Sequence, residues 1–324
     1  MLLFVDAATR RGLQIYSDES DPAFKKHLAK SRNAYGELVR SSVAREEVAR
    51  TLTLKFRARD NSSMVKVQVY VPFPSPGRNT KLPLVVYYHG GGFVVMSAHA
   101  YEHNARAMAN AVGAIVAVVD YRLAPEHKYP AAHDDALDGL RKAAEWCRRD
   151  DRCDISRVAL AGDSAGGHLA AATALDAWEL EMDGTLPSGL KAQVLLVPIV
   201  APFLSLPSHL RRLDDPILGR GLLNWFWSRY LGDASRDTCD PRLHLLRREK
   251  AFWQAVPPAI VVTGHFDPVS DEGEDYARHL HTKNVSVYAA RRLEAHVQFA
   301  PSTLGWTHGA LKALLNGDAV PPCC

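Results

Sequence analysis

Short, continuously apolar runs recur along the sequence, and segments long enough to form helices separate them. The runs lie at 82–88, 114–119, 158–160, 194–197 and 259–262, and they are preceded by an alternating run at 65–71 that predicts a half-buried strand. Parallel strands that are covered on both faces have this composition, because neither face meets water. Helices are predicted at about 99–112, 131–150, 165–182, 271–283 and 303–316. Alternating strands and helices predict an α/β fold with a mostly parallel, doubly wound sheet.

Two segments depart from this alternation. Residues 21–41 predict an N-terminal helix, since one of its faces carries the apolar side chains Phe24, Leu28, Tyr35 and Leu38. The interval 201–256 is long, begins and ends near prolines, and contains Trp225-Phe226-Trp227 and Tyr230. We interpret this interval as an insertion that forms a helical lid and packs against the N-terminal helix.

The predicted organisation therefore has four parts. Residues 1–50 form an N-terminal helical cap, 51–200 the first part of the α/β core, 201–256 the lid, and 257–324 the second part of the core. A chain of 324 residues with 47% hydrophobic residues can bury one large core of this kind.

Charge and cysteine content exclude several classes of protein. The net charge is +3 and the densest basic clusters are pairs such as Arg211-Arg212, so no stripe for nucleic acid is predicted. The five cysteines include no C-x-x-C pair, which predicts no metal, no cofactor and reduced thiols in a cytoplasmic protein. The apolar run 1–5 is shorter than a signal-peptide core, and no run reaches membrane-spanning length, so stable membrane insertion is not expected.

The segment Gly162-Asp163-Ser164-Ala165-Gly166 matches G-x-S-x-G. It follows a predicted strand and opens a predicted helix, which is the context that a nucleophile elbow requires. Small residues two positions either side of the serine leave room for a tight turn. The turn lifts the Ser164 hydroxyl above the sheet, and the helix amino terminus points free amides at a developing anion.

The segment His89-Gly90-Gly91-Gly92-Phe93 ends the run 82–88. Consecutive glycines allow backbone amides to approach a ligand oxygen without a Cβ in the way. We predict Gly91, Gly92 and Ala165 as the amide donors of an oxyanion hole, with Gly90 shaping the turn. A phosphate-binding loop is disfavoured, because neither Gly-Lys-Ser/Thr nor G-x-G-x-x-G occurs there.

The carboxylate of a catalytic triad should follow the serine in this fold. Asp267 lies just past the run 259–262, at the end of a parallel strand where catalytic groups belong. Asp271 and Glu272 are the alternatives, but they fall in the first turn of the next helix, where the helix dipole favours acids. Asp267 is therefore the predicted acid, and Asp271 is predicted to cap.

The histidines that follow Asp267 in the sequence are the candidates for the catalytic base. His279 and His281 fall within or at the end of a predicted helix, and His308 falls in the final helix. His296 follows the last strand-like run, 285–289, after a short loop, so it is the predicted base. His265 stands beside the acid and either perturbs the site or faces solvent.

Four ordered motifs between about 65 and 300 resemble the hormone-sensitive-lipase-like carboxylesterases. They are His89 to Phe93, Asp120 to His127, Gly162 to Gly167 and Phe266 to Gly273. The resemblance implies an α/β-hydrolase fold and a serine esterase with Ser164, Asp267 and His296 as its triad. It implies that His89 braces the glycine loop, while the segment from Asp120 is read as structural, with polar links from Arg122 and Glu126.

The expected activity is hydrolysis of short-to-medium acyl or aryl esters through an acyl-enzyme. The expected partner is a small-molecule ester, and since the family includes monomers and dimers a homodimer is one expectation. The family carries His-Gly-Phe where this chain has His296-Val297-Gln298-Phe299, one residue longer. A catalytically silent ligand receptor on the same fold is therefore an alternative, and amide or carbamate hydrolysis by the same triad is another.

Overall fold

One sheet organises the described strands of the computed structural model. The structure describes residues 19–41, 43–74, 80–186, 188–202, 206–213, 215, 218–232, 240–248, 253, 256–292 and 301–322. The eight strands of the sheet are β1 (Arg50–Arg57), β2 (Met64–Val71), β3 (Leu82–Tyr88), β4 (Ile115–Asp120), β5 (Cys153–Asp163), β6 (Leu190–Leu196), β7 (Ala259–Gly264) and β8 (Val287–Arg292). Their order is β1-β2-β4-β3-β5-β6-β7-β8, with β2 antiparallel to both neighbours and every other pair parallel. The predicted mostly parallel sheet is confirmed.

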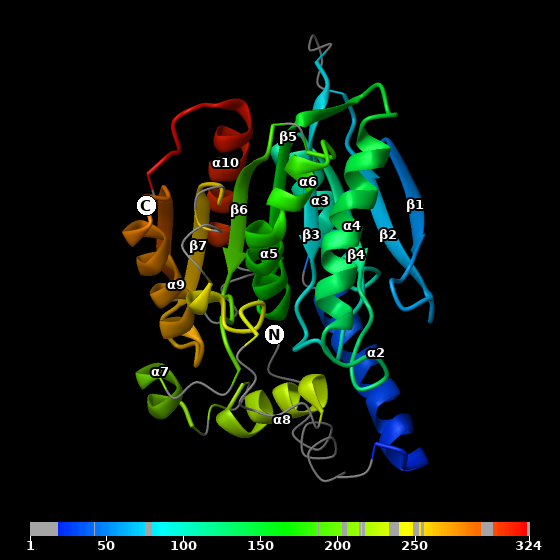
Figure 1. Ribbon diagram of the computed structural model, residues 1–324, viewed down its shortest axis with the longest axis vertical. Coiled ribbons are helices and arrows are strands. Elements are labelled where there is room, and N and C mark those ends of the chain that lie inside the picture. Colours follow the sequence, from blue (N-terminus) through cyan, green and yellow to red (C-terminus); the bar gives the residue numbers. More distant parts are fainter. Residues whose placement is uncertain are drawn as a thin grey trace.

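Helices cover both faces of the sheet (Figure 1). The longer ones are α2 (Pro22–Ser41), α3 (Glu102–Val112), α4 (Ala131–Cys147), α5 (Ala165–Asp176), α8 (Arg220–Leu231), α9 (Ser270–Thr282) and α10 (Pro301–Asn316). Short helical turns are α6 (Trp178–Met182), α7 (Pro207–Arg211) and η2 (Leu245–Arg247). Helices α3 and α10 pack on one face, whereas α4, α5 and α9 pack on the other. Strand β3 serves both cores, because alternate side chains point to opposite faces.

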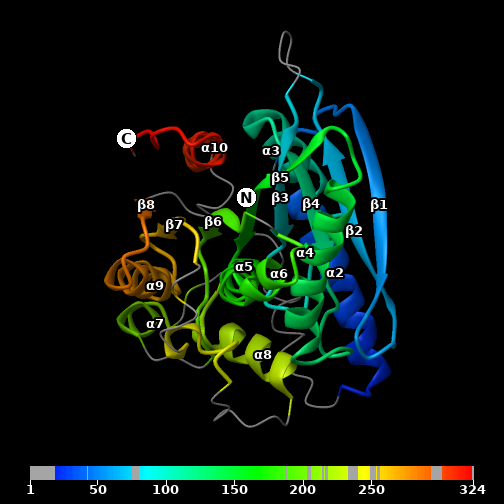
Figure 2. The same cartoon turned by 45° about the horizontal axis from the view of Figure 1, so that its top comes forward.

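The interval 201–256 lies between β6 and β7, and its described residues form α7, α8 and η2. Figures 1 and 2 show α8 crossing beyond the end of the sheet at which β3 and β5 finish, near α2. Trp225, Trp227 and Tyr230 of α8 are buried, so the aromatic cluster predicted for this interval belongs to the core. Phe226 is half-buried.

Sequence periodicity located most elements but missed one strand. The run 82–88 is strand β3 to the residue, and predicted helix 165–182 is present but divided at Ala177 into α5 and α6. Strand β1 was not predicted, although Leu52, Leu54 and Phe56 alternate in its sequence. That alternation is the signal that could have identified it.

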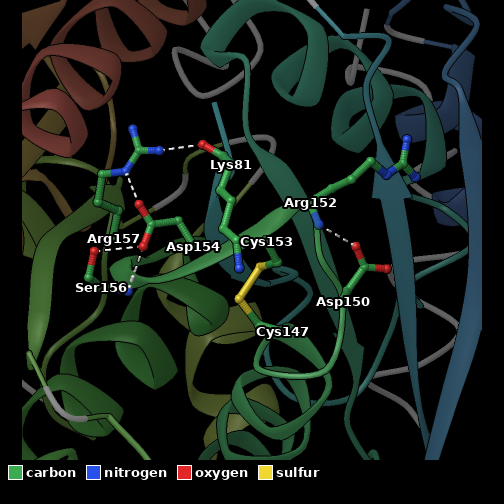
Figure 3. The surroundings of a disulfide bond; sticks show 8 residues. All are labelled: Lys81, Cys147, Asp150, Arg152, Cys153, Asp154, Ser156 and Arg157. Atoms are coloured by element: carbon green, nitrogen blue, oxygen red, sulfur yellow. Dashed lines mark hydrogen bonds and ion pairs between the residues drawn. A yellow bond between two sulfur atoms is a disulfide. The ribbon is translucent and has the colours of Figure 1, made fainter. Parts of the chain in front are cut away.

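A disulfide joins Cys147 at the end of α4 to Cys153 at the start of β5, with the two Cα atoms 5.1 Å apart (Figure 3). The prediction of reduced thiols is therefore wrong for this pair. The turn between them brings the two residues together, since the Cys153 amide donates to the Asp150 carbonyl at 3.0 Å. A spacing of six residues matches no metal or redox motif, so the sequence pattern did not reveal the bond.

The segment after β4 is structural, as predicted. The Arg122 guanidinium is buried and donates to both carboxylate oxygens of Asp135 at 2.8 Å, and it also pairs with Asp60. Glu126 accepts from Arg32 of α2 at 2.8 Å. These ion pairs tie α2 and α4 to the end of the sheet.

Within the described ranges, no helix has the length and apolar character needed to cross a membrane. Nor do the described side chains include three or more His, Cys, Asp or Glu placed to hold a metal ion.

Candidate active site

The motif at 162–166 forms the turn between β5 and α5. Ser164 has φ 54° and ψ −119°, angles that residues other than glycine rarely adopt. Its amide donates to the Leu196 carbonyl of β6 at 2.8 Å, and its carbonyl accepts from the His168 amide at 3.0 Å. A strained, partly exposed serine between a strand and a helix has the geometry of a nucleophile elbow.

The two glycines of the motif are required sterically. A Cβ on Gly162 would lie 2.2 Å from the Gly166 carbonyl oxygen, and a Cβ on Gly166 would lie 2.0 Å from the Tyr88 carbonyl oxygen. Both obstacles are backbone atoms, which cannot rotate away as a side chain can. The small residues that the sequence predicted around the serine are therefore explained by the tightness of the turn.

The amides predicted to stabilise an oxyanion are unbonded in the described part of the chain. Ala165 is the first residue of α5, and Gly91 and Gly92 have φ values of 113° and 59°. No described residue accepts a hydrogen bond from any of these three amides. Free amides at a helix amino terminus and on a glycine turn are suited to binding negative charge.

Asp163 links the elbow to the glycine loop. Its buried carboxylate accepts hydrogen bonds from the Gly90 amide at 3.0 Å, the Tyr87 hydroxyl at 2.9 Å and the Tyr101 hydroxyl at 2.7 Å. Burial raises the pKa of Asp163 to about 6, against the opposing effect of these donors. A Cβ on Gly90 would lie 2.4 Å from Asp163 Oδ2, so the loop can approach the carboxylate only with glycine there.

His89 is fully buried beside the same loop. Its Nδ1 donates to the Gly90 carbonyl at 2.8 Å, and its ring stacks on Tyr121 with centroids 4.2 Å apart. The Tyr121 hydroxyl donates to the His89 carbonyl at 2.6 Å. Burial lowers the pKa of His89. These contacts accord with the bracing role that the family resemblance implies.

Asp267 lies three residues past the end of β7 and is partly exposed. Its Oδ1 accepts the Val269 amide at 2.9 Å, and no described residue donates to its Oδ2. Desolvation of the carboxyl group by the surrounding protein, with additional repulsion from Glu272 and Asp215, raises the pKa of Asp267 to about 7. A cation beside Oδ2 would favour the ionised form, and a protonated imidazole supplies one.

The two alternative acids have other partners. Asp271 Oδ2 accepts the Ser208 amide at 2.7 Å and so binds the first turn of α7. The prediction that Asp271 caps its own helix is therefore wrong. Glu272 is buried and accepts from the Val200 amide at 2.7 Å and from His209 Nε2 at 3.0 Å. Asp271 Oδ1 also accepts from Arg211 at 3.4 Å, so every oxygen of these two carboxylates has a partner, which favours Asp267 as the acid.

The histidines differ in what the structure says of them. His296 lies outside the described residues, so its role stays a prediction. Burial in α10 lowers the pKa of His308 to about 4, and no described residue shares a hydrogen bond with its ring. His279 packs on Trp253 with ring centroids 4.5 Å apart, and His265 is exposed. None of these described rings bonds to Ser164.

A pair of buried histidines behind the elbow was missed by the sequence analysis. His168 Nδ1 donates to the Ile199 carbonyl at 3.1 Å, and His168 Nε2 lies 3.1 Å from His133 Nε2. The Arg242 carbonyl lies 3.1 Å from both Nε2 atoms. His133 Nδ1 then accepts from the Tyr230 hydroxyl at 2.7 Å. Burial lowers both pKa values, that of His168 to about 4. Only tertiary contact joins them, so no local sequence signal could have found the pair.

Comparison with known proteins places this site in a family. A family model described as alpha/beta hydrolase fold matches residues 85–299, and a carboxylesterase family model matches residues 28–126. Carboxylesterase NlhH of Mycobacterium tuberculosis is 39% identical over 246 residues, 74% of each chain. An arylesterase of Saccharolobus solfataricus is 32% identical over 89% of each chain.

Solved structures of esterases have the same fold as this chain. The esterase of the archaeon Pyrobaculum calidifontis superposes with a TM-score of 0.76 at 32% identity, covering 89% of this chain and 91% of that one. The carboxylesterase EstE1, cloned from a metagenomic library, gives a TM-score of 0.77 at 30% identity, covering 89% of this chain and 97% of that one. The elbow and sheet thus define an α/β hydrolase. The chain belongs to the hormone-sensitive-lipase-like group of that family, and the predicted resemblance is confirmed.

Proposed function

We propose that this carboxylic ester hydrolase cleaves short-to-medium acyl or aryl esters by a Ser164-His296-Asp267 mechanism. The observation that carries the proposal is Ser164 itself, held at φ 54° on a strand-to-helix turn, next to the Ala165 amide, which donates to no residue that the structure describes. Strain of this kind persists only where the surrounding structure maintains it, and it collects at catalytic sites.

In the proposed reaction His296 takes the proton of Ser164 as the hydroxyl attacks the ester carbonyl. The amides of Gly91, Gly92 and Ala165 stabilise the oxyanion, and each such donor is worth about 3 kcal/mol of barrier in other serine hydrolases. His296 then protonates the leaving alcohol. Water repeats the attack on the acyl-enzyme and releases the acid.

Asp267 holds the His296 imidazole in the required tautomer and stabilises its protonated form. Among the described residues nothing donates to its Oδ2, and its pKa is raised. Both features suit this role, because a carboxylate whose charge is disfavoured by desolvation gains most from a neighbouring cation. The Val269 amide fixes Oδ1 and so orients the carboxyl group.

The test is hydrolysis of p-nitrophenyl butyrate by wild type and single variants. Ser164→Ala should abolish turnover, and Asp267→Asn should lower kcat by about 10³ to 10⁴. His296→Ala should lower kcat similarly, while His308→Ala, a buried histidine with no bond to the elbow, should retain activity per folded molecule. If His308→Ala abolishes turnover and His296→Ala does not, the base is misassigned.

An inactive wild type that still binds the ester would favour the silent receptor over the enzyme. A panel that pairs p-nitrophenyl butyrate with butyryl p-nitroanilide separates ester from amide hydrolysis. The same panel, extended along the acyl chain, measures the acyl preference.

A further inference from the structure

The glycine loop after β3 adopts a conformation that it could not hold alone. Three successive residues have positive φ, namely Gly91 at 113°, Gly92 at 59° and Phe93 at 63°. Phe93 has a Cβ, so this angle is unfavourable for it. Internal bonds are few: the amides of Val94 and Val95 both donate to the Gly91 carbonyl, at 3.0 and 2.9 Å. External contacts must therefore stabilise the loop.

Helix α8 supplies the first set of external contacts. A Cβ placed on Gly92 would lie 2.4, 2.5 and 2.8 Å from three ring carbons of Phe226, so the ring packs directly against the Gly92 Cα. The next loop residue, Phe93, is buried and stacks on Tyr230 of the same helix with centroids 4.1 Å apart and planes 12° from parallel. Trp227 adds a tilted contact to the Phe93 ring at 5.4 Å.

Helix α2 supplies the second set. Arg32 Nε donates to the Val94 carbonyl at 2.8 Å, and one terminal nitrogen donates to the Ala124 carbonyl at 3.0 Å. The ion pair with Glu126 fixes the guanidinium plane between these carbonyls. Helix α2 thus contacts the loop at the Val94 carbonyl, and helix α8 contacts it at the Gly92 Cα. Neither contact uses the amides of Gly91 and Gly92, which donate to no described residue.

Helices α2 and α8 are also joined to each other. The Arg229 guanidinium of α8 lies 5.4 Å from the ring centroid of Phe24 of α2. The same guanidinium pairs with Glu19, just before α2, at 3.1 Å. The two helices therefore form one support, which packs on the loop from outside the sheet.

We propose that Arg32 and Phe226 are positioning residues of the oxyanion hole, through which the cap and lid helices hold the Gly91 and Gly92 amides in their productive orientation. This inference rests on the proposed esterase function. Neither side chain takes part in proton transfer. Their loss should weaken binding of the tetrahedral oxyanion more than binding of the ester, because only the oxyanion draws its full stabilisation from these amides.

The experiment measures kcat and KM for p-nitrophenyl butyrate together with the inhibition constant of a butyl trifluoromethyl ketone, whose serine hemiketal carries the oxyanion. Arg32→Met and Phe226→Ala should each lower kcat about tenfold with KM changed less than about twofold. The inhibition constant should rise by a similar factor. Phe226→Leu, which still fills space against Gly92, should recover part of the loss.

Matched controls separate positioning from general destabilisation. Leu223→Ala removes an apolar, partly buried side chain from α8, and Arg40→Met removes an ion-paired arginine from α2. Both should leave kcat and the inhibition constant near wild type at equal folded concentration. Because Arg32 and Phe226 act on one loop, the double variant should lose less than the product of the two single losses.

The outcomes are distinguishable. If wild type is active and Ser164→Ala is not, but Arg32→Met and Phe226→Ala match their controls in kcat and ketone affinity, the positioning proposal fails and the esterase proposal stands. If wild type does not hydrolyse the ester or Ser164→Ala retains turnover, the esterase proposal fails first.

Discussion

Single residues at the elbow act through backbone spacing and buried charge. Ser164 can reach its angles because Gly162 and Gly166 have no Cβ that would clash with the backbone carbonyls of Gly166 and Tyr88. The carboxylate of Asp163, the residue before Ser164, accepts a hydrogen bond from the Gly90 amide. Ser164 therefore supplies the hydroxyl group, and Asp163 orients the glycine loop that follows β3. Two adjacent residues of the turn after β5 thereby fix the position of the end of β5 relative to the end of β3.

Gly166→Ala should prevent formation of the elbow. The added methyl would stand 2.0 Å from the Tyr88 carbonyl oxygen, and relieving the clash requires β3 or α5 to shift. We expect loss of activity and a fall in unfolding free energy of about 3 kcal/mol, measured by urea denaturation. Gly305→Ala is the control, because a Cβ there meets nothing within 4 Å and should stabilise α10 by about 0.5 kcal/mol.

Asp163→Asn should change how stability depends on pH. Burial raises the pKa of Asp163 to about 6, so the folded protein binds this proton more tightly than the unfolded chain does. The contribution to stability is full below the unfolded pKa of about 3.9 and is lost as pH rises through 6. Relative to the Asn variant, wild type should lose on the order of 3 kcal/mol between pH 4 and 7. An identical slope for both proteins in urea titrations would contradict this.

Elements of this fold differ in how well the sequence predicts them. Strand β3 is apolar on both faces and was predicted to the residue, whereas β1, at the sheet edge, is half exposed and was missed. The tight turns at Ser164 and at Gly90 to Gly92 could be located from the sequence, because turn conformation depends on local residues, whereas their catalytic roles stay predictions. The His133–His168 pair and the disulfide depend on contacts between α4, α5 and β5, which no periodicity encodes.

The disulfide should stabilise the junction of α4 and β5. It closes a short loop, and the chain-entropy estimate for such a loop is about 2 kcal/mol. Cys147→Ala/Cys153→Ala should lower the unfolding free energy by that amount, and dithiothreitol should lower that of wild type similarly. Dithiothreitol added to the double variant should have no further effect; a further loss would mean that the reductant acts elsewhere.

The whole molecule is joined at its centre by a hydrogen-bonded chain that crosses three helices. Tyr230 of α8, His133 of α4 and His168 of α5 are bonded in sequence, and His168 ends on the Ile199 carbonyl beyond β6. Arg242 and Arg248 lie near enough to His133 to oppose its protonation, and His244 opposes that of His168. Charging either ring should therefore weaken the contacts that join α8, α4, α5 and the end of β6.

Acid should accordingly destabilise the molecule through His168. Burial lowers the pKa of His168 to about 4, so its contribution to stability is present above the unfolded value and is lost as pH falls from 6.5 toward 4. Compared with His168→Asn, whose amide can still donate to the Ile199 carbonyl, wild type should lose on the order of 3 kcal/mol over that range. The two curves, measured by urea denaturation at each pH, should converge at low pH; parallel curves would refute the assignment.

The contact between Phe226 and Gly92 affects how the substrate selectivity of this enzyme could be engineered. Exchanging caps between related hydrolases is an attractive way to alter selectivity, because the exchange leaves the sequence of the scaffold unchanged. In this molecule the exchanged helix would bring its own aromatic ring, or none, to the turn that holds the backbone donors. The kcat of a chimera that exchanges residues 206–232 should therefore be measured first on the smallest ester. Only then can a change in its substrate range be attributed to the side chains of the exchanged segment.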